Sequence, residues 1–365
     1  MYRLVSITLV TIIVLSLITP GYITTFANNA PNYILIKDAL GRTINITEKP
    51  LKIVSLAPSI TEEIFYLGLQ KYLVGVDNTS YTDLHFGIAD YLKENKITPV
   101  GGYWWSTISV EKILSLKPNI VFADKGAHIK LLDFFNKYNI TVIYLNAGAS
   151  KSLQDIYEDL NILATIYGKE QLVTNFIKKV EKNIATYRVK FESFKYKKVL
   201  VVVGIYNGIW IAGKSTYIDD MLSRLGLENV ADVIGWKSVN IEKIIDWSPQ
   251  VILITSMGIT RDIVEKSGLY KTGAQIIFLD QNTTDALCRP GPLIIYLPSL
   301  LYKYLSGINT TEIHSETNIP ATTTSTQPEN AGIITNNIWV IILITVAFFI
   351  IGVVTGYYIS RAKKG

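Results

Sequence analysis

The chain has 365 residues, of which 49% are hydrophobic and 18% charged, and this balance is typical of a folded protein rather than a disordered one. The length exceeds what one ordinary domain needs, so we expect two modest domains. The net charge of +5 is small for this length, which argues against nucleic acid as a partner. The only cysteine, Cys288, excludes an internal disulfide and leaves no cysteine near the N-terminus to carry a lipid anchor.

The first 30 residues have the pattern of a secretory signal peptide. Arg3 precedes an almost unbroken apolar run from Leu4 to Ile18, and small residues follow as far as Ala30. The alternative is an uncleaved anchor, which leaves the topology unchanged.

A folded body is expected over residues 32–305, where short β-branched runs alternate with helical stretches. The runs with strand character are 52–56, 72–76, 120–123, 142–145, 199–203, 251–254 and 276–279. This alternation predicts an α/β architecture with buried strands. The spacing of Ser59 and Glu62 predicts a capping box, and Gly68 is expected to end the helix that follows.

A long amphipathic stretch divides this body into lobes over residues 32–150 and 196–305. In the connector, residues 151–195, apolar side chains such as Ile156, Leu160 and Leu163 recur three or four positions apart. We therefore predict a long rigid helix between two α/β lobes, with Gly168 as the place where it would be interrupted.

One segment occurs once in each lobe without a gap. Trp105, Glu111 and Pro118 correspond to Trp236, Glu242 and Pro249, and an apolar run follows each proline. Ser109 and Asn240 are suitable N-caps, which places Glu111 and Glu242 in the first turns of equivalent helices. These glutamates could simply interact favourably with the helix dipole, and each tryptophan could simply close the core of its lobe. Alternatively, paired aromatic residues would suit a flat ligand between the lobes.

The C-terminal part predicts a membrane tether. Residues 306–337 are rich in Thr, Ser, Asn and Pro and indicate a flexible stalk, and residues 338–360 predict a transmembrane helix. The basic residues of the tail, 361–365, predict a cytoplasmic end, which places the lobes on the cell surface. Five Asn-x-Ser/Thr sequons suit a glycosylated protein, although the pattern is weak; they are Asn45, Asn78, Asn139, Asn282 and Asn309.

The sequence contains few motifs that would indicate an enzyme. Residues 208–215 match a phosphate-binding loop, but their bulky centre favours a strand, a turn at Gly213 and a capped helix. His85, His128 and His314 are isolated and are interpreted as surface or loop histidines. We expect no catalytic residue, no metal site and no cofactor, and Cys288 is expected to be a buried, reduced thiol.

The body resembles the periplasmic binding proteins of the cobalamin and iron-siderophore ABC importers, the class III family with two α/β lobes joined by a helical backbone. The resemblance rests on the runs 38–42, 52–68, 73–76, 109–121, 210–213, 248–255 and 289–292. It implies a binding protein that delivers its ligand to an ABC permease. The alternatives from another class are an extracellular enzyme and an adhesion module.

The resemblance also implies roles for particular residues. Glu111 and Glu242 match the glutamates that dock onto the permease. The ligand contacts implied are Trp105, Trp210, Trp236, Tyr81 and Arg289, although the residues around Tyr81 depart from the family pattern. A corrinoid is the expected ligand, with a ferric siderophore or haem as the alternative. Metal would therefore arrive only inside the cargo, and the chain is expected to be a monomer.

Overall fold

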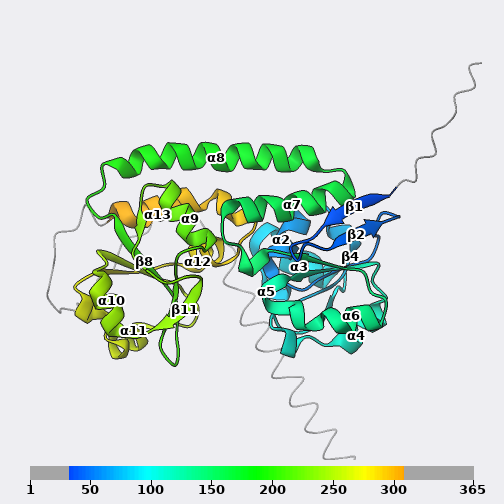
Figure 1. Cartoon of the computed structure of the whole chain (residues 1–365), viewed down its shortest axis with the longest axis horizontal. Helices are drawn as coiled ribbons and strands as arrows, with labels where there is room; N and C mark the ends of the chain where they lie inside the picture. The colour runs from blue at the N-terminus through cyan, green and yellow to red at the C-terminus, as the bar shows by residue number, and fades with distance from the viewer. Residues whose placement is uncertain (1–32, 308–365) are drawn as a thin grey trace, which may run out of the picture. The chain divides into compact units, whose positions relative to one another are not determined.

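The computed structural model describes residues 33–307, and the predicted signal peptide, transmembrane helix, basic tail and most of the stalk lie outside them. Among the described residues, no helix combines the length and the apolarity needed to cross a membrane. The described part holds two α/β lobes with one main sheet each (Figure 1), as predicted, and a separate two-stranded sheet.

The sheet of the N-terminal lobe has five parallel strands in the order β5-β4-β3-β6-β7. They are β3 (Ile53–Ser55), β4 (Leu73–Val76), β5 (Thr98–Pro99), β6 (Ile120–Asp124) and β7 (Val142–Leu145). The helices of this lobe are α2 (Pro58–Tyr66), α3 (Ile88–Glu94), α4 (Val110–Leu116), α5 (Lys125–His128) and α6 (Leu132–Lys137). Four of these strands coincide with predicted apolar runs.

The sheet of the C-terminal lobe has the order β11-β9-β8-β12-β13, with β10 beside β8. Its strands are β8 (Lys198–Ile205), β9 (Ile209–Ala212), β10 (Glu228–Asn229), β11 (Trp236–Val239), β12 (Val251–Ile254) and β13 (Gln275–Phe278). The helices are α9 (Tyr217–Arg224), α10 (Ile241–Trp247), α11 (Arg261–Ser267), α12 (Gln281–Cys288) and α13 (Leu297–Ser306). Strands β9 and β11 run antiparallel and form one edge.

Both sheets are covered on two faces, and one of the resulting cores is shared between the lobes. Successive side chains of a strand point to opposite faces, so Val201 joins the shared core and Val202 joins a core private to its lobe. In the N-terminal lobe, Phe122 joins the shared core and Val121 joins a core private to that lobe. The shared core therefore ties the two lobes together.

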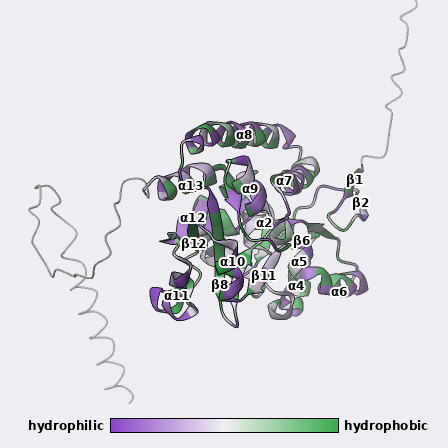
Figure 2. Ribbon diagram, turned by 60° about the vertical axis from the view of Figure 1, so that its left-hand side comes forward, coloured by the Kyte–Doolittle hydropathy of each residue, from purple (hydrophilic) through white to green (hydrophobic). Residues whose placement is uncertain are grey.

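The predicted connector is two helices rather than one. Helix α7 (Leu153–Tyr167) ends at Gly168, whose φ of 66° is left-handed, and α8 (Glu170–Glu192) starts two residues later. Only α8 runs past both lobes in Figure 1. Its buried residues are Val173, Phe176, Val180, Ile184 and Phe191, and Figure 2 shows the matching alternation of hydrophobic and hydrophilic residues.

Two local features differ from the prediction. The capping box is wrong, because α2 begins at Pro58 with Ala57 as its N-cap, which places Ser59 inside the helix. The hairpin of β1 (Ile34–Lys37) and β2 (Thr43–Ile46) was not predicted. The expected stop at Gly68 is confirmed by its left-handed φ of 70°.

Candidate functional site

The repeated segments form equivalent structures in the two lobes. Helices α4 and α10 each span seven residues and begin at the predicted N-caps, where Ser109 accepts from the N–H of Lys112 and Asn240 from that of Lys243. The strands β6 and β12 follow. Both helices lie on the side of the lobes away from α8 in Figure 1.

Glu111 and Glu242 lie in the first turns of these helices and are exposed. Within residues 33–307 neither carboxylate forms an ion pair; Glu111 only accepts a long hydrogen bond of 3.3 Å from Ser109 Oγ. One exposed carboxylate per lobe is therefore available to a partner.

In the N-terminal lobe, Trp105 lies in a loop with two further aromatic residues, Tyr103 and Trp104. We call this loop, residues 101–107, the aromatic loop. Trp105 is 40% exposed and Trp104 59% exposed, although large aromatic side chains usually bury most of their surface. The ammonium of Lys130 lies 4.6 Å from the centre of the Trp105 ring. This loop thus presents an indole that the lobe's own core does not cover.

In the C-terminal lobe, Trp210 and Trp236 share one face of the edge hairpin. Trp210 of β9 is paired with Ser238 of β11, and Trp236 lies two residues before Ser238, so both indoles point the same way. Trp210 stacks on Tyr206 with ring centres 5.6 Å apart, while Trp236 packs 6.1 Å from Tyr217. Both tryptophans are half-buried.

One member of each aromatic set packs against the core that the lobes share. These residues are Tyr103 of the aromatic loop and Trp236 of β11. Burial raises the pKa of Tyr217, on which Trp236 packs, and the charges of Cys288, Tyr103 and Glu62 raise it further. Each aromatic set therefore has one residue at the shared core.

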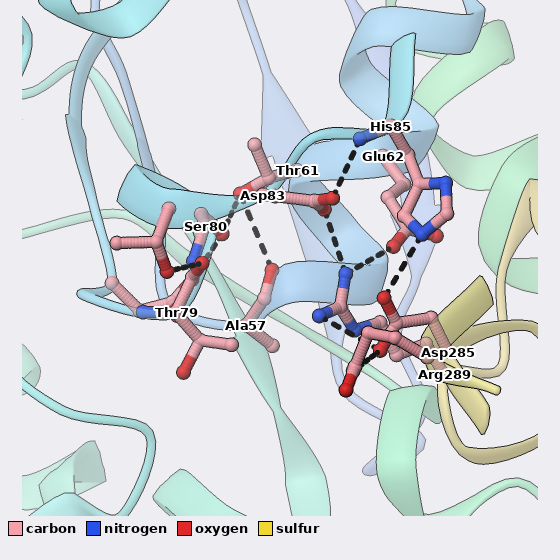
Figure 3. Close-up of polar contacts among 12 residues, drawn as sticks. Ala57, Thr61, Glu62, Thr79, Ser80, Asp83, His85, Asp285 and Arg289 are labelled. Atoms are coloured by element: carbon pink, nitrogen blue, oxygen red, sulfur yellow. Dashed lines mark hydrogen bonds and ion pairs between the residues drawn. The ribbon is translucent and has the colours of Figure 1, made fainter. Parts of the chain in front are cut away.

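Arg289 lies at the junction of the two lobes, at the end of α12 (Figure 3). Its guanidinium is 3.1 Å from Glu62 Oε1, 2.8 Å from Asp83 Oδ2 and 3.1 Å from Asp285 Oδ1. Asp285 also lies 2.9 Å from Nε2 of His85. We call these five residues the junction cluster; within residues 33–307, it holds all the ion pairs that join the two lobes.

The junction cluster has more acidic than basic groups. Burial raises the pKa of Glu62 well above its ordinary value, and the Asp83 carboxylate raises it further, while Arg289 opposes both effects. Arg289 is thus engaged by carboxylates, and any contact with a ligand remains a prediction. Tyr81 is half-buried, four residues after the buried Asp77, and packs against the shared core.

Several predictions about chemistry can be compared with this geometry. Ile209–Ala212 is a strand and Thr216 caps α9, so the predicted strand and capped helix are confirmed. Lys214 donates to the backbone oxygen of Asn229, which gives no support to the alternative of a phosphate-binding loop. His128 is fully buried, which corrects its assignment to the surface or a loop. Cys288 is half-buried rather than buried as predicted, and it is a free thiol. Loss of solvent around the sulfur raises the pKa of Cys288 to about 12, so the thiol keeps its proton.

Sequence patterns missed the junction cluster, because its partners lie up to 227 residues apart. The only available signal was that Glu62 and Arg289 fall within two of the runs that carry the family resemblance. The repeat does place Trp105 and Trp236 at equivalent positions before α4 and α10, and their contact with a ligand stays a prediction.

Residues 53–277 match the model of the family described as "Periplasmic binding protein". The match covers more than half of the chain, and the chain therefore belongs to this family of binding proteins.

Among curated relatives, it is 29% identical over 241 residues to the uncharacterized ABC transporter substrate-binding lipoprotein YvrC of Bacillus subtilis, covering 64% of this chain and 72% of the relative. It is 28% identical to the vitamin B12-binding protein of Pectobacterium atrosepticum, covering 56% and 71%.

Solved structures show the same fold. The periplasmic heme-binding protein RhuT of Roseiflexus, in apo form, superposes with a TM-score of 0.54 at 25% identity, covering 70% of this chain and 98% of that one. The periplasmic vitamin B12-binding protein BtuF of Vibrio cholerae gives 0.55 at 20% identity, covering 72% and 99%.

Proposed function

We propose that this chain is the substrate-binding subunit of an ABC importer and that it captures a corrinoid between its lobes. The observation that carries the proposal is that each lobe presents indoles that its core does not fully cover, Trp105 on one lobe and Trp210 and Trp236 on the other. Indole rings bury about 150 to 250 Å² each and suit the broad face of a macrocycle. Curated relatives named vitamin B12-binding proteins support the same ligand class.

Haem is the alternative, and the histidines and the cysteine give it little support. A protein that holds haem commonly offers a histidine, cysteine, methionine or tyrosine to the iron. Among the described residues, His85 is paired with Asp285, His128 is buried, and the Cys288 thiol keeps its proton. Tyr206 and Met257 are exposed, and a haem iron would have to use a tyrosine or methionine of this kind. A corrinoid that carries its own axial ligands needs none of these.

The ligand class can be tested by titrating the full chain in detergent with cyanocobalamin, haemin and a ferric catecholate siderophore, each followed by calorimetry. Saturable binding of cyanocobalamin alone is expected. Trp105→Ala and Trp210→Ala should each weaken it at least tenfold, whereas Trp247→Phe, in a private core, should not. Binding of haemin or the siderophore instead would replace the corrinoid proposal, and no binding at all would refute chelate capture.

Delivery to the permease is proposed to depend on Glu111 and Glu242. Two exposed carboxylates, one per lobe, would set the orientation of docking onto basic residues of the permease. In cells that depend on the importer, Glu111→Lys with Glu242→Lys should abolish cobalamin uptake and spare ligand affinity. Glu265→Lys, an exposed glutamate of α11, is the matched control, and normal uptake by the double variant would contradict the docking role.

The lobes are proposed to lie outside the cytoplasm on a membrane tether formed by residues 338–360. A stalk of roughly 30 residues spans on the order of 30 Å and keeps the lobes close to a permease. Protease treatment of intact cells should release a soluble fragment containing both lobes. A fragment protected until the cells are lysed would contradict this topology.

A further inference from the structure

The aromatic loop is fixed by backbone contacts at its base. Gly101 forms a bridge with Ile108, and the N–H of Gly102 donates to the Thr107 oxygen at 3.1 Å. The N–H and hydroxyl of Thr107 both donate to the Trp104 oxygen. These contacts close the loop, but they do not fix its tip relative to the lobe.

The tip is held by Tyr103, whose side chain points into the lobe while Trp104 and Trp105 are exposed. The Tyr103 hydroxyl donates a short hydrogen bond to Asp124 Oδ2, and the Tyr103 carbonyl oxygen lies 2.6 Å from His128 Nε2. His128 Nδ1 in turn accepts from the N–H of Asp124 at 3.0 Å. These bonds require the neutral imidazole with its proton on Nε2.

Asp124 is a fully buried carboxylate with its acceptor sites filled. Besides Tyr103, it accepts from the N–H groups of Gly126, Ala127 and Gly148 at 2.6 to 3.2 Å. Gly148 leaves room for this arrangement, because a Cβ there would lie 2.7 Å from Asp124 Oδ2 and still closer to the Tyr103 hydroxyl. Three separate segments thus converge on one tyrosine.

We propose that Tyr103, Asp124 and His128 are positioning residues that hold the aromatic loop so that Trp105 meets the ligand in a preset orientation. The inference rests on the proposed function, in which Trp105 contacts the ligand. Fixing the indole before binding removes part of the ordering cost of association. We call the hydrogen bonds among Tyr103, Asp124 and His128 the clamp. Removing it should therefore weaken binding without removing any group that touches the ligand.

The first test compares Tyr103→Phe with Tyr167→Phe in the full chain. Both changes delete one hydroxyl, and that of Tyr167 donates to the Pro50 oxygen at 3.0 Å on a different element. Tyr103→Phe should speed hydrogen exchange of residues 101–109 at least tenfold and weaken cyanocobalamin binding five- to tenfold. Tyr167→Phe should change neither the exchange rate of the loop nor the affinity, even if the melting temperature falls equally in both variants.

Gly148→Ala provides a second route that leaves every hydrogen-bonding group in place. The added methyl group displaces Tyr103 by contact alone, so it should reproduce both effects of Tyr103→Phe. Gly168→Ala, a similar change at the end of α7, is the control and should leave the loop unchanged.

A pH profile distinguishes positioning from a general loss of packing. A proton added to His128 Nδ1 would face the N–H of Asp124, so acid should release the loop; the other titratable groups around the ring are Tyr103, Asp124 and Tyr144. Wild-type affinity should fall at acid pH, whereas His128→Gln, which keeps a donor for the Tyr103 oxygen, should lose this acid limb.

The outcomes separate the two proposals. Faster exchange in Tyr103→Phe with unchanged cyanocobalamin affinity would overturn the positioning role and leave ligand capture intact. Unchanged exchange would overturn the clamp itself. If the wild-type chain binds no cyanocobalamin, the proposed corrinoid function fails first, and the inference that rests on it fails with it.

Discussion

Arg289 is the cation on which the buried acidic side chains of the junction depend. Its side chain is 15% exposed, and the Glu62 and Asp83 side chains beside it have no exposure at all. A buried ion pair adds little net stability over an apolar packing, but loss of one partner leaves the other charges unpaired.

Arg289→Met should therefore lower the free energy of unfolding by about 3 to 5 kcal/mol. Arg224→Met is the control, since the Arg224 pairs with Glu181 and Asp220 are partly exposed and worth about 0 to 1 kcal/mol. Urea denaturation measures both. An equal decrease in the free energy of unfolding in the two variants would show that Arg289 stabilises the fold no more than an exposed ion pair does.

Glu63 predicts a pH dependence of stability. It is buried without a hydrogen bond to Oε2, and burial, followed by repulsion from Asp159 and Glu62, raises its pKa well above 4.5. The folded state thus holds a proton that the unfolded state releases, so the contribution is complete below about pH 4.5 and is lost as pH rises toward the folded pKa.

Glu63→Gln should flatten this decline and stabilise the chain near neutral pH, by about 1.4 kcal/mol for each unit of pKa shift that is removed. Urea denaturation across pH 4 to 8 measures the slope. Glu265→Gln, at an exposed position, should leave the slope unchanged; an unaltered slope in Glu63→Gln would mean that Glu63 is ionised in the folded state.

Local sequence predicted the residues whose positions show in spacing, and missed those defined by distant partners. The N-caps Ser109 and Asn240 were recognised from the repeat, whereas His128 looked like a loop residue because its contact, the Tyr103 oxygen, lies 25 positions earlier. Burial of a polar side chain depends on what the rest of the chain places around it, and no periodic pattern records that.

At the scale of elements, the repeat also sets how α4 and α10 end. Lys117 and Ser248 occupy the same position after these helices, with φ values of 48° and 52°. A side chain in this left-handed region costs roughly 1 to 2 kcal/mol, and glycine avoids that cost at an entropic penalty of about 0.5 to 1 kcal/mol.

Lys117→Gly and Ser248→Gly should each therefore stabilise the chain by about 0.5 to 1 kcal/mol. Thermal unfolding measures the gain. Lys117→Ala serves as the control, because alanine keeps the Cβ and should give no gain; a gain from alanine would point to the lysine charge rather than the backbone.

Most strands could be predicted because parallel strands with two covered faces are continuous apolar runs, as in Val251–Ile254. The β1–β2 hairpin could not, since its exposed and buried residues alternate over only four positions per strand. The connector was predicted as one helix because its apolar spacing continues past Gly168. The glycine itself marked the place of the interruption, and α7 ends there.

At the scale of the molecule, the two lobes share a core in addition to the private core of each lobe. One continuous apolar cluster includes Phe122 of the N-terminal sheet, Phe176 of α8 and Val201 of the C-terminal sheet. The folded lobes should therefore lose their structure together.

We expect calorimetry of the full chain to show one transition for the lobes, with equal calorimetric and van't Hoff enthalpies. Phe176→Ala, which opens the shared core, should move this transition down as a whole, at a cost of about 3 to 5 kcal/mol. Splitting into two transitions would show that each lobe folds on its own.

The shared core also affects how the chain is made. Residues 33–192 leave the ribosome first, carrying the apolar faces of α2, α7 and α8, and the strands and helices that cover the rest of this surface are still being synthesised. This apolar surface of the nascent chain is therefore exposed to aggregation until the second lobe has been synthesised. Although the two halves are similar, the first half cannot complete its core before the second half is made.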